Sequence, residues 1–530
     1  MNWSAVREWK PGPWQDWEAR LQQERRTALA QADELDQAKA RLAGAYGDTA
    51  DAARAELGRQ LAVLDDMIGD LSETLLAVAE FADAVWQVQT LVREVEFELD
   101  RRQLTMRADG SVTVPDWLAW EPDPRARAVK QQIIKDVESM AANVVSLAEA
   151  ADAELARRLT AVADGSYRSI ETHRSFTPGL PDAPDPNWSA SQVAAWWAAL
   201  TDAEKQAIIT GHPEWIGNLD GIDAASRDQA NRILLAKQLA KAQAEVDEYL
   251  KNMRLTEPLP TRGVPPELLD KLNALKAIAD TLADPRFAAD AKLLLLDLDH
   301  GMPKAAIALG DVDHAKNVVT YVPGINTNVA EWMRYYTNQV SNIRSQAGGT
   351  NQPAPDLAAI AWLGYDEPTY LTTAQTWSAG DGADKLNRFT EGIQASRLAS
   401  GAGDPHQTVF GHSYGSTTAG MAVRDVRTGT VDDLIMIGSP GSGAQTVGEY
   451  NLTPGHAWVS GMDNGDAVQG IGPDAIFGRN PMKMPGVTHL SGNGGGPHPG
   501  SIPLFDRHMS YLDPGSDTLM DIAKVIMGQR

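Results

Sequence analysis

A five-residue motif, Gly411-His412-Ser413-Tyr414-Gly415, has the residue types and spacing of a nucleophile elbow. The motif follows an apolar run and precedes a segment of small residues, so a strand–turn–helix unit is expected around it. The two glycines leave space where strand and helix approach closely, and the strained turn would expose the hydroxyl between them. The motif therefore predicts Ser413 as a catalytic nucleophile.

The same turn would place the Tyr414 N–H at a helix N-terminus, where it can stabilise a developing oxyanion. A second donor is expected from the Pro-Gly turn at residues 323–325, which follows another apolar run. The Ile325 N–H is the candidate for this second donor. The alternative is an ordinary strand-to-helix turn in which Asn326 or Thr327 is the N-cap.

A serine hydroxyl is a weak nucleophile near neutral pH, so a histidine must accept its proton and a carboxylate must orient that histidine. With this type of elbow the chain order is serine, acid, histidine. Asp466 follows the apolar run at residues 457–460 and is the predicted acid, with Asp463 as its alternative. His508 precedes a final helix expected to start near Ser516 and is the predicted base.

Other histidines lie near these candidates in the sequence. His489 and His498 follow the predicted acid, but either can be an ordinary surface histidine. His412 adjoins the nucleophile, and neighbouring side chains diverge on such a turn, so a structural hydrogen bond beneath the elbow is expected for it. His489, His498, His508 and Asp506 lack the spacing of known zinc motifs. No lysine follows the glycine motif as in a phosphate-binding loop, so no metal, nucleotide or other cofactor is predicted.

The elements that would carry these residues change character along the chain. Beyond residue 285, short continuous apolar runs alternate with helix-length segments, which is typical of buried strands in a mostly parallel sheet with helices on both faces. The expected strands lie at residues 292–298, 305–309, 317–322, 357–363, 408–410, 434–437 and 457–460. Residues 286–530 are therefore predicted to form an α/β domain.

The N-terminal part shows helical periodicity instead. Apolar residues three and four positions apart predict long helices over residues 61–99 and 133–162, and a preceding helix at about 14–45 would complete a three-helix bundle. Between the two long helices, alternation on both sides of Asp109-Gly110 predicts a β-hairpin near residues 103–115. Residues 1–175 are thus expected to form a helical bundle with a hairpin.

Two proline-rich breaks separate the regions. The first, at residues 176–188, is too rich in proline for a helix or a central strand and is predicted to be a linker. Residues 189–285 form a predicted helical connecting region, with Ser189 or Ser191 as N-cap and Trp196 and Trp197 as buried anchors. The second break, at residues 258–266, lies within this connecting region.

Composition excludes several classes of protein. The 530 residues allow about three domains at roughly 150 residues each. The hydrophobic fraction of 43% and the charged fraction of 22% are those of a folded globular protein. A formal net charge of -24 argues against nucleic-acid binding and electrostatic membrane binding. The absence of cysteine excludes disulfides and thiolate nucleophiles.

The sequence shows no targeting segment. The first eight residues lack the apolar core of a secretory signal. Continuous apolar stretches such as residues 293–296 are far shorter than the roughly 18 residues of a membrane span. No transmembrane segment is therefore expected, and the localisation is left open, with the cytoplasm as the default and export by another route as the alternative.

Eight separated motifs relate this chain to known proteins. They are DGSV at 109–112, VAAWW at 193–197, IGNLDGI at 216–222, YVPG at 321–324, WLGYD at 362–366, GHSYG at 411–415, GSPG at 438–441 and YLDPGS at 511–516. On these motifs the chain resembles actinobacterial proteins of the α/β-hydrolase fold, whose function is largely unassigned. The resemblance implies a triad of Ser413, Asp466 and His508, with Ala467 where the family usually has proline in its G-D-x-V loop.

The N-terminal helices resemble the helical hairpins of WXG-type proteins, which ESX systems export. Tyr167 and Glu171 match a short Y-x-x-x-[DE] export signal after the helical pair, whereas the Trp215-Ile216-Gly217 triplet lies far from the turn between the helices. This resemblance implies export by an ESX-type route and a helical protein partner.

These observations predict a serine hydrolase that cleaves a carboxylic ester or related acyl bond of a small-molecule or lipid-like substrate through an acyl-enzyme. Ser413 would attack the acyl carbon, His508 would transfer the proton, and Asp466 would hold the imidazole. The alternative is a helical interaction or exported protein whose hydrolase domain has weak or no activity.

Overall fold

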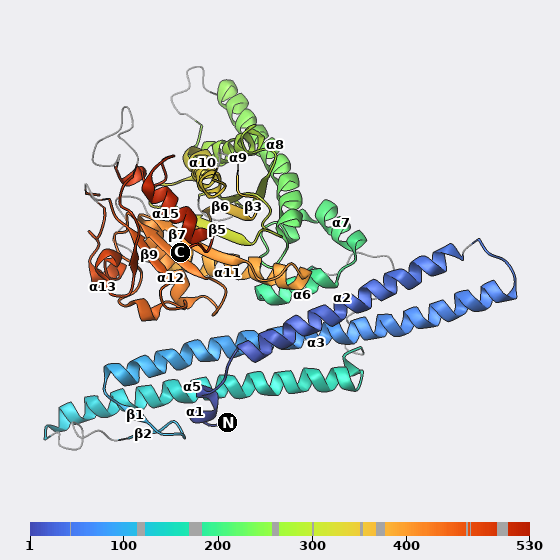
Figure 1. The fold of residues 1–530 in the computed structure, drawn as a ribbon, viewed down its shortest axis with the longest axis horizontal. Coiled ribbons are helices and arrows are strands. Elements are labelled where there is room, and N and C mark those ends of the chain that lie inside the picture. The colour runs from blue at the N-terminus through green and yellow to red at the C-terminus, as the bar shows by residue number, and fades with distance from the viewer. Residues whose placement is uncertain are drawn as a thin grey trace. The chain divides into compact units, whose positions relative to one another are not determined.

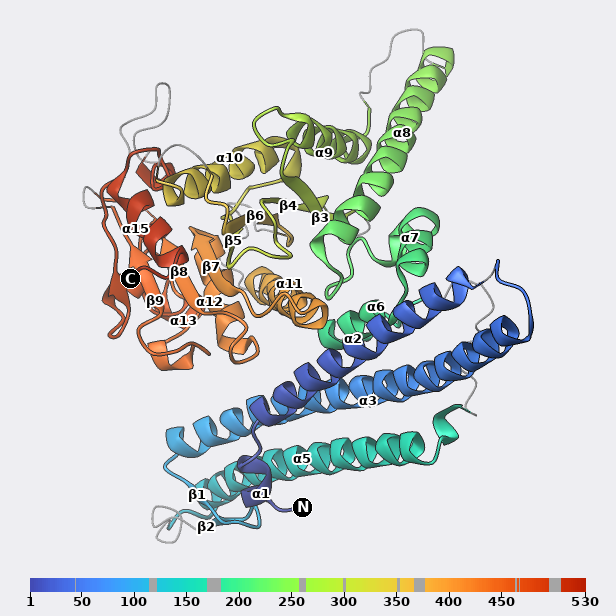
Figure 2. The same cartoon turned by 45° about the vertical axis from the view of Figure 1, so that its right-hand side comes forward.

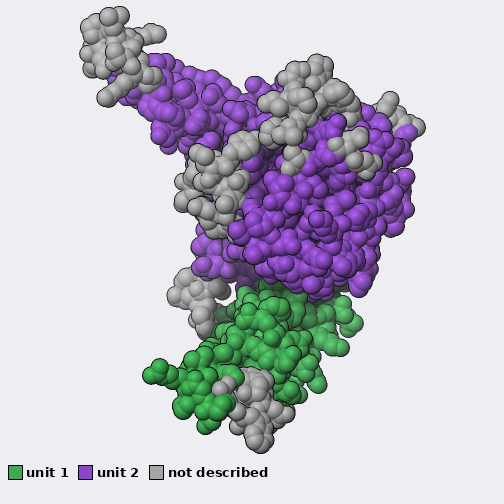
Figure 3. Space-filling model, turned by 90° about the vertical axis from the view of Figure 1, so that its left-hand side faces the viewer, with its two compact units in different colours: residues 1–181 green, residues 182–530 purple. Residues whose placement is uncertain are grey.

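The computed structural model describes residues 1–42, 44–113, 122–168, 183–256, 264–298, 302–349, 353–366, 377–462, 465–466, 468–494 and 507–530. The chain divides into two compact units, Met1–Pro181 and Asp182–Arg530, which we call the helical unit and the α/β unit (Figure 3). The division falls within the proline-rich stretch 176–188. Residues 189–285, expected as a connecting region, lie in the same compact unit as the sheet.

The helical unit is built around one long helix. Its elements are α1 (Trp3–Arg7), α2 (Gly12–Arg41), α3 (Asp48–Arg101), β1 (Thr105–Met106), β2 (Val112–Thr113), α5 (Pro124–Ala163) and the 3-10 turn η1 (Ser166–Arg168). Helix α3 packs against both α2 and α5 and lies between them (Figures 1 and 2). Strands β1 and β2 pair antiparallel, which gives the hairpin that the alternation around Asp109 predicts.

The apolar spacing of α3 explains its packing. Val78, Val85 and Val92 are almost fully buried, in the register that the sequence predicts for the seam. Gln89 interrupts this register, and its side-chain amide donates a hydrogen bond of 2.9 Å to the carbonyl of Val6 at the end of α1. The polar residue in the seam therefore ties the first helix of the chain to the longest one.

Helix α3 is the one helix in the described ranges that is long and apolar enough to cross a membrane by length and composition alone. Half of its most apolar stretch is buried inside the helical unit. Core helices of soluble proteins share this length and composition, so these two properties do not by themselves indicate a membrane span.

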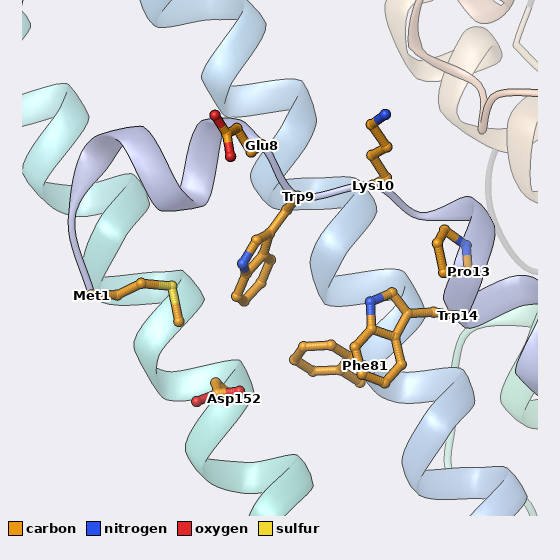
Figure 4. A pocket seen from close by; sticks show the side chains of 8 residues that line it. All are labelled: Met1, Glu8, Trp9, Lys10, Pro13, Trp14, Phe81 and Asp152. Atoms are coloured by element: carbon orange, nitrogen blue, oxygen red, sulfur yellow. The ribbon is translucent and has the colours of Figure 1, made fainter. Parts of the chain in front are cut away.

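A pocket of about 370 Å³ opens in the helical unit between the α1–α2 segment, α3 and α5 (Figure 4). Trp9 and Trp14 line it together with Phe81 of α3, whose ring lies 5.4 Å and 4.5 Å from theirs between centroids. These rings pack on one another and hold the α1–α2 segment against α3. No serine or histidine lines this pocket, so its walls contain no nucleophile–base pair.

The α/β unit contains an eight-stranded sheet in the order β10-β9-β8-β7-β5-β6-β4-β3. The strands are β3 (Ala291–Asp297), β4 (Lys304–Leu309), β5 (Asn317–Val322), β6 (Leu357–Leu363), β7 (His406–His412), β8 (Asp433–Ile437), β9 (Ala457–Ser460) and β10 (Thr488–His489). The β3–β4 and β4–β6 pairs are antiparallel, and the strand pairs from β6 through β5 to β10 are parallel. The fold class predicted from the apolar runs is confirmed.

Helices cover both faces of this sheet (Figures 1 and 2). The helices of this unit are α6 (Ala190–Ala199), α7 (Asp202–Gly211), α8 (Ala224–Thr256), α9 (Pro266–Ala283), α10 (Val329–Ala347), α11 (Trp377–Ser400), α12 (Tyr414–Asp425), α13 (Asp474–Phe477) and α15 (Asp517–Ile526), with 3-10 turns at Pro213–Trp215, Val447–Glu449 and Pro481–Lys483. Side chains alternate along β5, with Val319 and Tyr321 in one core cluster and Val318 and Val322 in the other. Both faces of the strand are therefore buried, which explains why apolar residues occur on both of them.

The segment before the sheet is joined to its edge strand by side-chain hydrogen bonds. Ser189 caps α6 through a complete capping box, and Trp196 and Trp197 are buried. Asn218 exchanges two hydrogen bonds, of 2.9 Å and 2.8 Å, with the backbone of Leu296 in edge strand β3. The Asn218 amide thus pairs with backbone groups that the edge strand would otherwise leave open.

Candidate active site

Ser413 occupies a strained turn between β7 and α12. Its φ of 56° and ψ of -133° are outside the regions that residues other than glycine normally adopt. The backbone N–H of Ser413 donates to the carbonyl of Ile437 at the end of β8, with a distance of 3.0 Å. The strand–turn–helix geometry expected for the motif is present, and neighbouring strands hold it in place.

The turn after β5 lies directly against this serine. A Cβ atom on Gly324 would come within 2.8 Å of the Ser413 Cβ, closer than real contacts allow. Only glycine therefore fits at this position without a shift of Ser413. Ile325 follows Gly324, so the second predicted oxyanion donor belongs to a loop that adjoins Ser413.

The N-cap of helix α10, which follows this turn, differs from the expected one. Asn328, and not Asn326 or Thr327, is the N-cap of α10, because its side chain accepts a hydrogen bond of 3.0 Å from a first-turn N–H. Asn326 has a left-handed φ of 55°, and the Thr327 hydroxyl donates to the carbonyl of Gly324 at 2.7 Å. These two residues shape the loop beside Ser413 before the helix begins.

The predicted base and acid are in direct contact. His508 Nδ1 lies 2.8 Å from Asp466 Oδ2, and their side chains are 7% and 0% exposed. Gly438, which follows β8, lies beside the pair, since a Cβ there would come within 2.8 Å of both side chains. The pair is thus positioned at the carboxyl end of β8, next to the strand that ends at Ser413.

Further hydrogen bonds hold the Asp466 carboxylate. Its Oδ1 accepts from the Val468 N–H at 2.8 Å, and its Oδ2 accepts from the Tyr511 hydroxyl at 2.8 Å. Burial opposes ionisation of this carboxyl, but hydrogen bonds from His508, Val468 and Tyr511 outweigh it and lower its pKa to about 2. Asp466 is therefore ionised at neutral pH and can orient His508.

His412 has the structural role that the sequence predicts. Its Nε2–H donates a hydrogen bond of 2.8 Å to the backbone carbonyl of His508, and the two rings lie 4.5 Å apart between centroids. Burial, reinforced by the neighbouring His508, lowers the pKa of His412 to about 3. His412 is thus a neutral imidazole that connects the Ser413 turn to the segment that carries His508.

Of the remaining candidates, one is exposed and three lie outside the described residues. His489 is exposed on β10. Asp463, His498 and Asp506 lie outside the described residues. Across the residues that are described, no three histidine, aspartate or glutamate side chains gather closely enough to hold a metal ion.

Sequence reasoning missed Tyr511 as part of the site. The residue belongs to the YLDPGS motif, but its type and position carry no chemical role until the fold brings it to Asp466. Val468 contributes a backbone N–H, which any residue except proline could supply, so no side-chain pattern could reveal it.

The sheet and the strand–turn–helix around Ser413 have the architecture of an α/β hydrolase. Residues 299–475 match a family described as "Alpha/beta hydrolase". An uncharacterized protein of Mycobacterium tuberculosis is 36% identical over 251 residues, which cover 45% of this chain and 91% of that protein. The chain belongs to this alpha/beta hydrolase family.

A second uncharacterized protein of Mycobacterium tuberculosis is 26% identical over 504 residues, which cover 88% of this chain and 75% of that protein. A match of this extent reaches into the helical unit. The relative therefore shares sequence with both units of this chain.

Two solved structures also match. A dienelactone hydrolase from Anabaena variabilis has a TM-score of 0.27 and 15% identity, over 45% of this chain and 96% of that one. An esterase from Pyrobaculum calidifontis has a TM-score of 0.28 and 12% identity, over 49% of this chain and 92% of that one.

Proposed function

We propose that this protein is a serine hydrolase that cleaves carboxylic esters or related acyl bonds. The Ser413 hydroxyl attacks the acyl carbon while His508 accepts its proton, and the leaving alcohol departs with that proton. Water then attacks the acyl-enzyme with His508 again as the base, which releases the acid and restores Ser413. Asp466 holds the imidazole in the tautomer that these transfers require.

The observation that carries this proposal is the buried contact between His508 Nδ1 and Asp466 Oδ2, 2.8 Å long, beside the strained Ser413 turn. Because the carboxylate accepts a hydrogen bond from Nδ1–H, Nε2 of the neutral imidazole is unprotonated. A general base needs this tautomer in order to accept a proton. Residues from three separate segments supply these groups. Their convergence at the ends of adjacent parallel strands supports a catalytic arrangement rather than a chance cluster.

The oxyanion formed on attack needs two hydrogen-bond donors. Tyr414 begins α12 and presents a backbone N–H where the helix has positive character. The Ile325 N–H follows Gly324, the residue in contact with Ser413. We assign the oxyanion hole to the Tyr414 and Ile325 N–H groups, because both adjoin the nucleophile and neither depends on side-chain chemistry.

Turnover of p-nitrophenyl butyrate by Ser413→Ala tests the proposal. Loss of the nucleophile should lower kcat by about 10⁴-fold or more. Ser396→Ala is the matched control, because Ser396 is a buried serine on α11 whose hydroxyl donates to a carbonyl of its own helix, that of Ile393 at 3.0 Å. The control should keep wild-type kcat. Equal turnover by Ser413→Ala and wild type would show that Ser413 is not the nucleophile.

A further inference from the structure

The Asp466 carboxylate has a second side-chain partner besides the base. Its Oδ2 atom accepts from His508 Nδ1 and from the Tyr511 hydroxyl, each at 2.8 Å. The same oxygen is therefore shared between the proposed general base and a tyrosine three residues further along the chain. Tyr511 itself touches neither Ser413 nor an oxyanion donor by any hydrogen bond described above.

The Tyr511 hydroxyl has a fixed direction. The side chain is 1% exposed, and the Met462 N–H donates to its oxygen at 3.2 Å. Because the backbone N–H is the donor in that contact, the hydroxyl proton is free to point at Asp466. Burial and the adjacent carboxylate raise the pKa of Tyr511 far above its usual range, so the phenol remains a donor throughout the working pH range.

Three hydrogen bonds fix the orientation of the Asp466 carboxylate. Oδ1 is fixed by the Val468 N–H, and Oδ2 is fixed by His508 and by Tyr511. Met462 and Val468 flank the acid in the loop after β9, whereas Tyr511 comes from the segment that carries the base. Tyr511 thus links the loop of the acid to the loop of the base through side-chain and backbone atoms.

Resting on the proposed function, we infer that Tyr511 is a positioning residue of the triad that acts through Asp466. Its hydroxyl holds the carboxylate against His508 Nδ1 and disperses the charge on Oδ2. When His508 gains the serine proton, the carboxylate must stay ionised and aligned to stabilise the imidazolium. Loss of the hydroxyl lets the carboxylate rotate at the step where its orientation matters most.

Tyr511→Phe in the full-length chain tests this role by the split between kcat and KM. We expect kcat for p-nitrophenyl butyrate to fall about tenfold, equal to about 1.4 kcal/mol in the barrier, with KM changed less than about twofold. Tyr450→Phe is the matched control, because Tyr450 is also buried and its hydroxyl donates at 2.8 Å to the carbonyl of Ser442. The control should lose a similar amount of thermal stability and keep wild-type kcat.

A double-mutant cycle separates positioning from general packing. If Tyr511 acts through Asp466, then Tyr511→Phe should cause no further loss of kcat when Asp466→Asn is already present. A second full tenfold loss in that background would overturn the proposal, and so would wild-type kcat in Tyr511→Phe alone. If Ser413→Ala keeps wild-type turnover, the proposed function and this inference fail together.

Fluorotyrosines installed at position 511 keep the inference testable if Tyr511→Phe does not fold. They retain the ring and the hydroxyl, and each added fluorine makes the phenol a stronger hydrogen-bond donor. A positioning role predicts that kcat changes progressively along the series while KM stays constant. A constant kcat along the series would show that the donor strength of Tyr511 does not matter to the reaction.

Discussion

The helical unit and the α/β unit contain ionisable pairs that differ in exposure. In the helical unit the valines of α3 form the core, and ion pairs such as Arg59–Glu56 lie on the surface with side chains 69% and 52% exposed. In the α/β unit an ionisable pair is itself buried, with Asp466 at 0% and His508 at 7% exposure. Buried charge is costly unless it is hydrogen-bonded, and three hydrogen bonds to the Asp466 carboxylate meet this requirement.

The α/β unit also contains an internal comparison. Asp433, at the first position of β8, accepts hydrogen bonds from His456 Nδ1 at 2.9 Å and Trp458 Nε1 at 2.7 Å. Asp466 and His508 lie beyond the other end of that strand, next to Gly438. Two buried aspartates thus bind histidines at opposite ends of the same strand. We propose a catalytic role for Asp466 and a structural role for Asp433.

The largest expected effect distinguishes these two aspartates. Asp466→Asn should lower kcat by about 10⁴-fold, because an amide favours the wrong tautomer of His508 with little change in shape. Asp433→Asn makes the same chemical change at a buried site and should lower thermal stability while kcat stays near wild type. Ester turnover and thermal melts of both variants check this. Comparable losses of kcat in the two variants would contradict the claim that Asp466, and not Asp433, supports catalysis.

Asp463→Asn extends this prediction to the alternative acid. It should retain nearly wild-type kcat, because Asp466 already occupies the position on His508 Nδ1. Full activity in Asp466→Asn together with loss in Asp463→Asn would reverse the assignment of the acid.

The next largest effect concerns the close approach of Gly324 to Ser413. Gly324→Ala should lower kcat by about 10-fold to 100-fold, because its Cβ would displace Ser413 or the Ile325 donor. Gly380→Ala is the control, since a Cβ at that helical position in α11 meets nothing within 4 Å. The control should keep kcat and melt slightly higher. Unchanged kcat in Gly324→Ala would mean that the turn after β5 does not contribute to the site.

A pH effect on stability tests a polar contact away from the site. Burial raises the pKa of Glu391 on α11 to about 7, although its carboxylate accepts from the Arg427 N–H at 3.1 Å. The folded state then binds a proton more tightly than the unfolded state, so this group's contribution is present at low pH and is lost as pH rises through about 7. Glu391→Gln should therefore raise the melting temperature more at pH 8 than at pH 5. An equal shift at both pH values would contradict the raised pKa.

The smallest effect is expected from removing the helical unit. A chain that begins at Asn187 keeps Ser189, the cap of α6, and should hydrolyse p-nitrophenyl butyrate within about twofold of the full-length rate. Far-ultraviolet circular dichroism checks that this fragment folds. A folded fragment that still reacts with a serine-directed probe but has lost turnover would show that the helical unit contributes to the active site.

Much of the fold could be predicted because periodicity is local information. The heptad-like spacing predicts α3 and α5, and the continuous apolar runs predict β3 to β9. Strand β10 was not predicted, because its two residues, Thr488 and His489, are exposed and form no apolar run. The N-cap of α10 was misplaced by one or two residues, because Asn326, Thr327 and Asn328 are all plausible caps in sequence and only the backbone geometry selects Asn328.

The candidate site likewise contains features that local sequence predicts and features that depend on the folded chain. The Ser413 turn follows from a local motif, whereas the contact between Asp466 and His508 depends on loops that meet only in the folded chain. The sequence could suggest these two residues from chain order and could not suggest Tyr511, whose role rests on one hydrogen bond.

ESX-type export and a helical partner stay predictions from resemblance. In the helical unit Tyr167 bonds to Asp70 of α3, and Glu171 lies outside the described residues.

Covalent labelling by a fluorophosphonate tests the central claim, a nucleophilic Ser413 activated by the His508–Asp466 pair, most directly. The full-length protein is incubated with the probe, digested, and the modified peptide is identified by mass spectrometry. Our account predicts a single adduct on Ser413, slowed strongly in Asp466→Asn and absent in Ser413→Ala. An unlabelled wild-type protein, or labelling on a different serine, would contradict it.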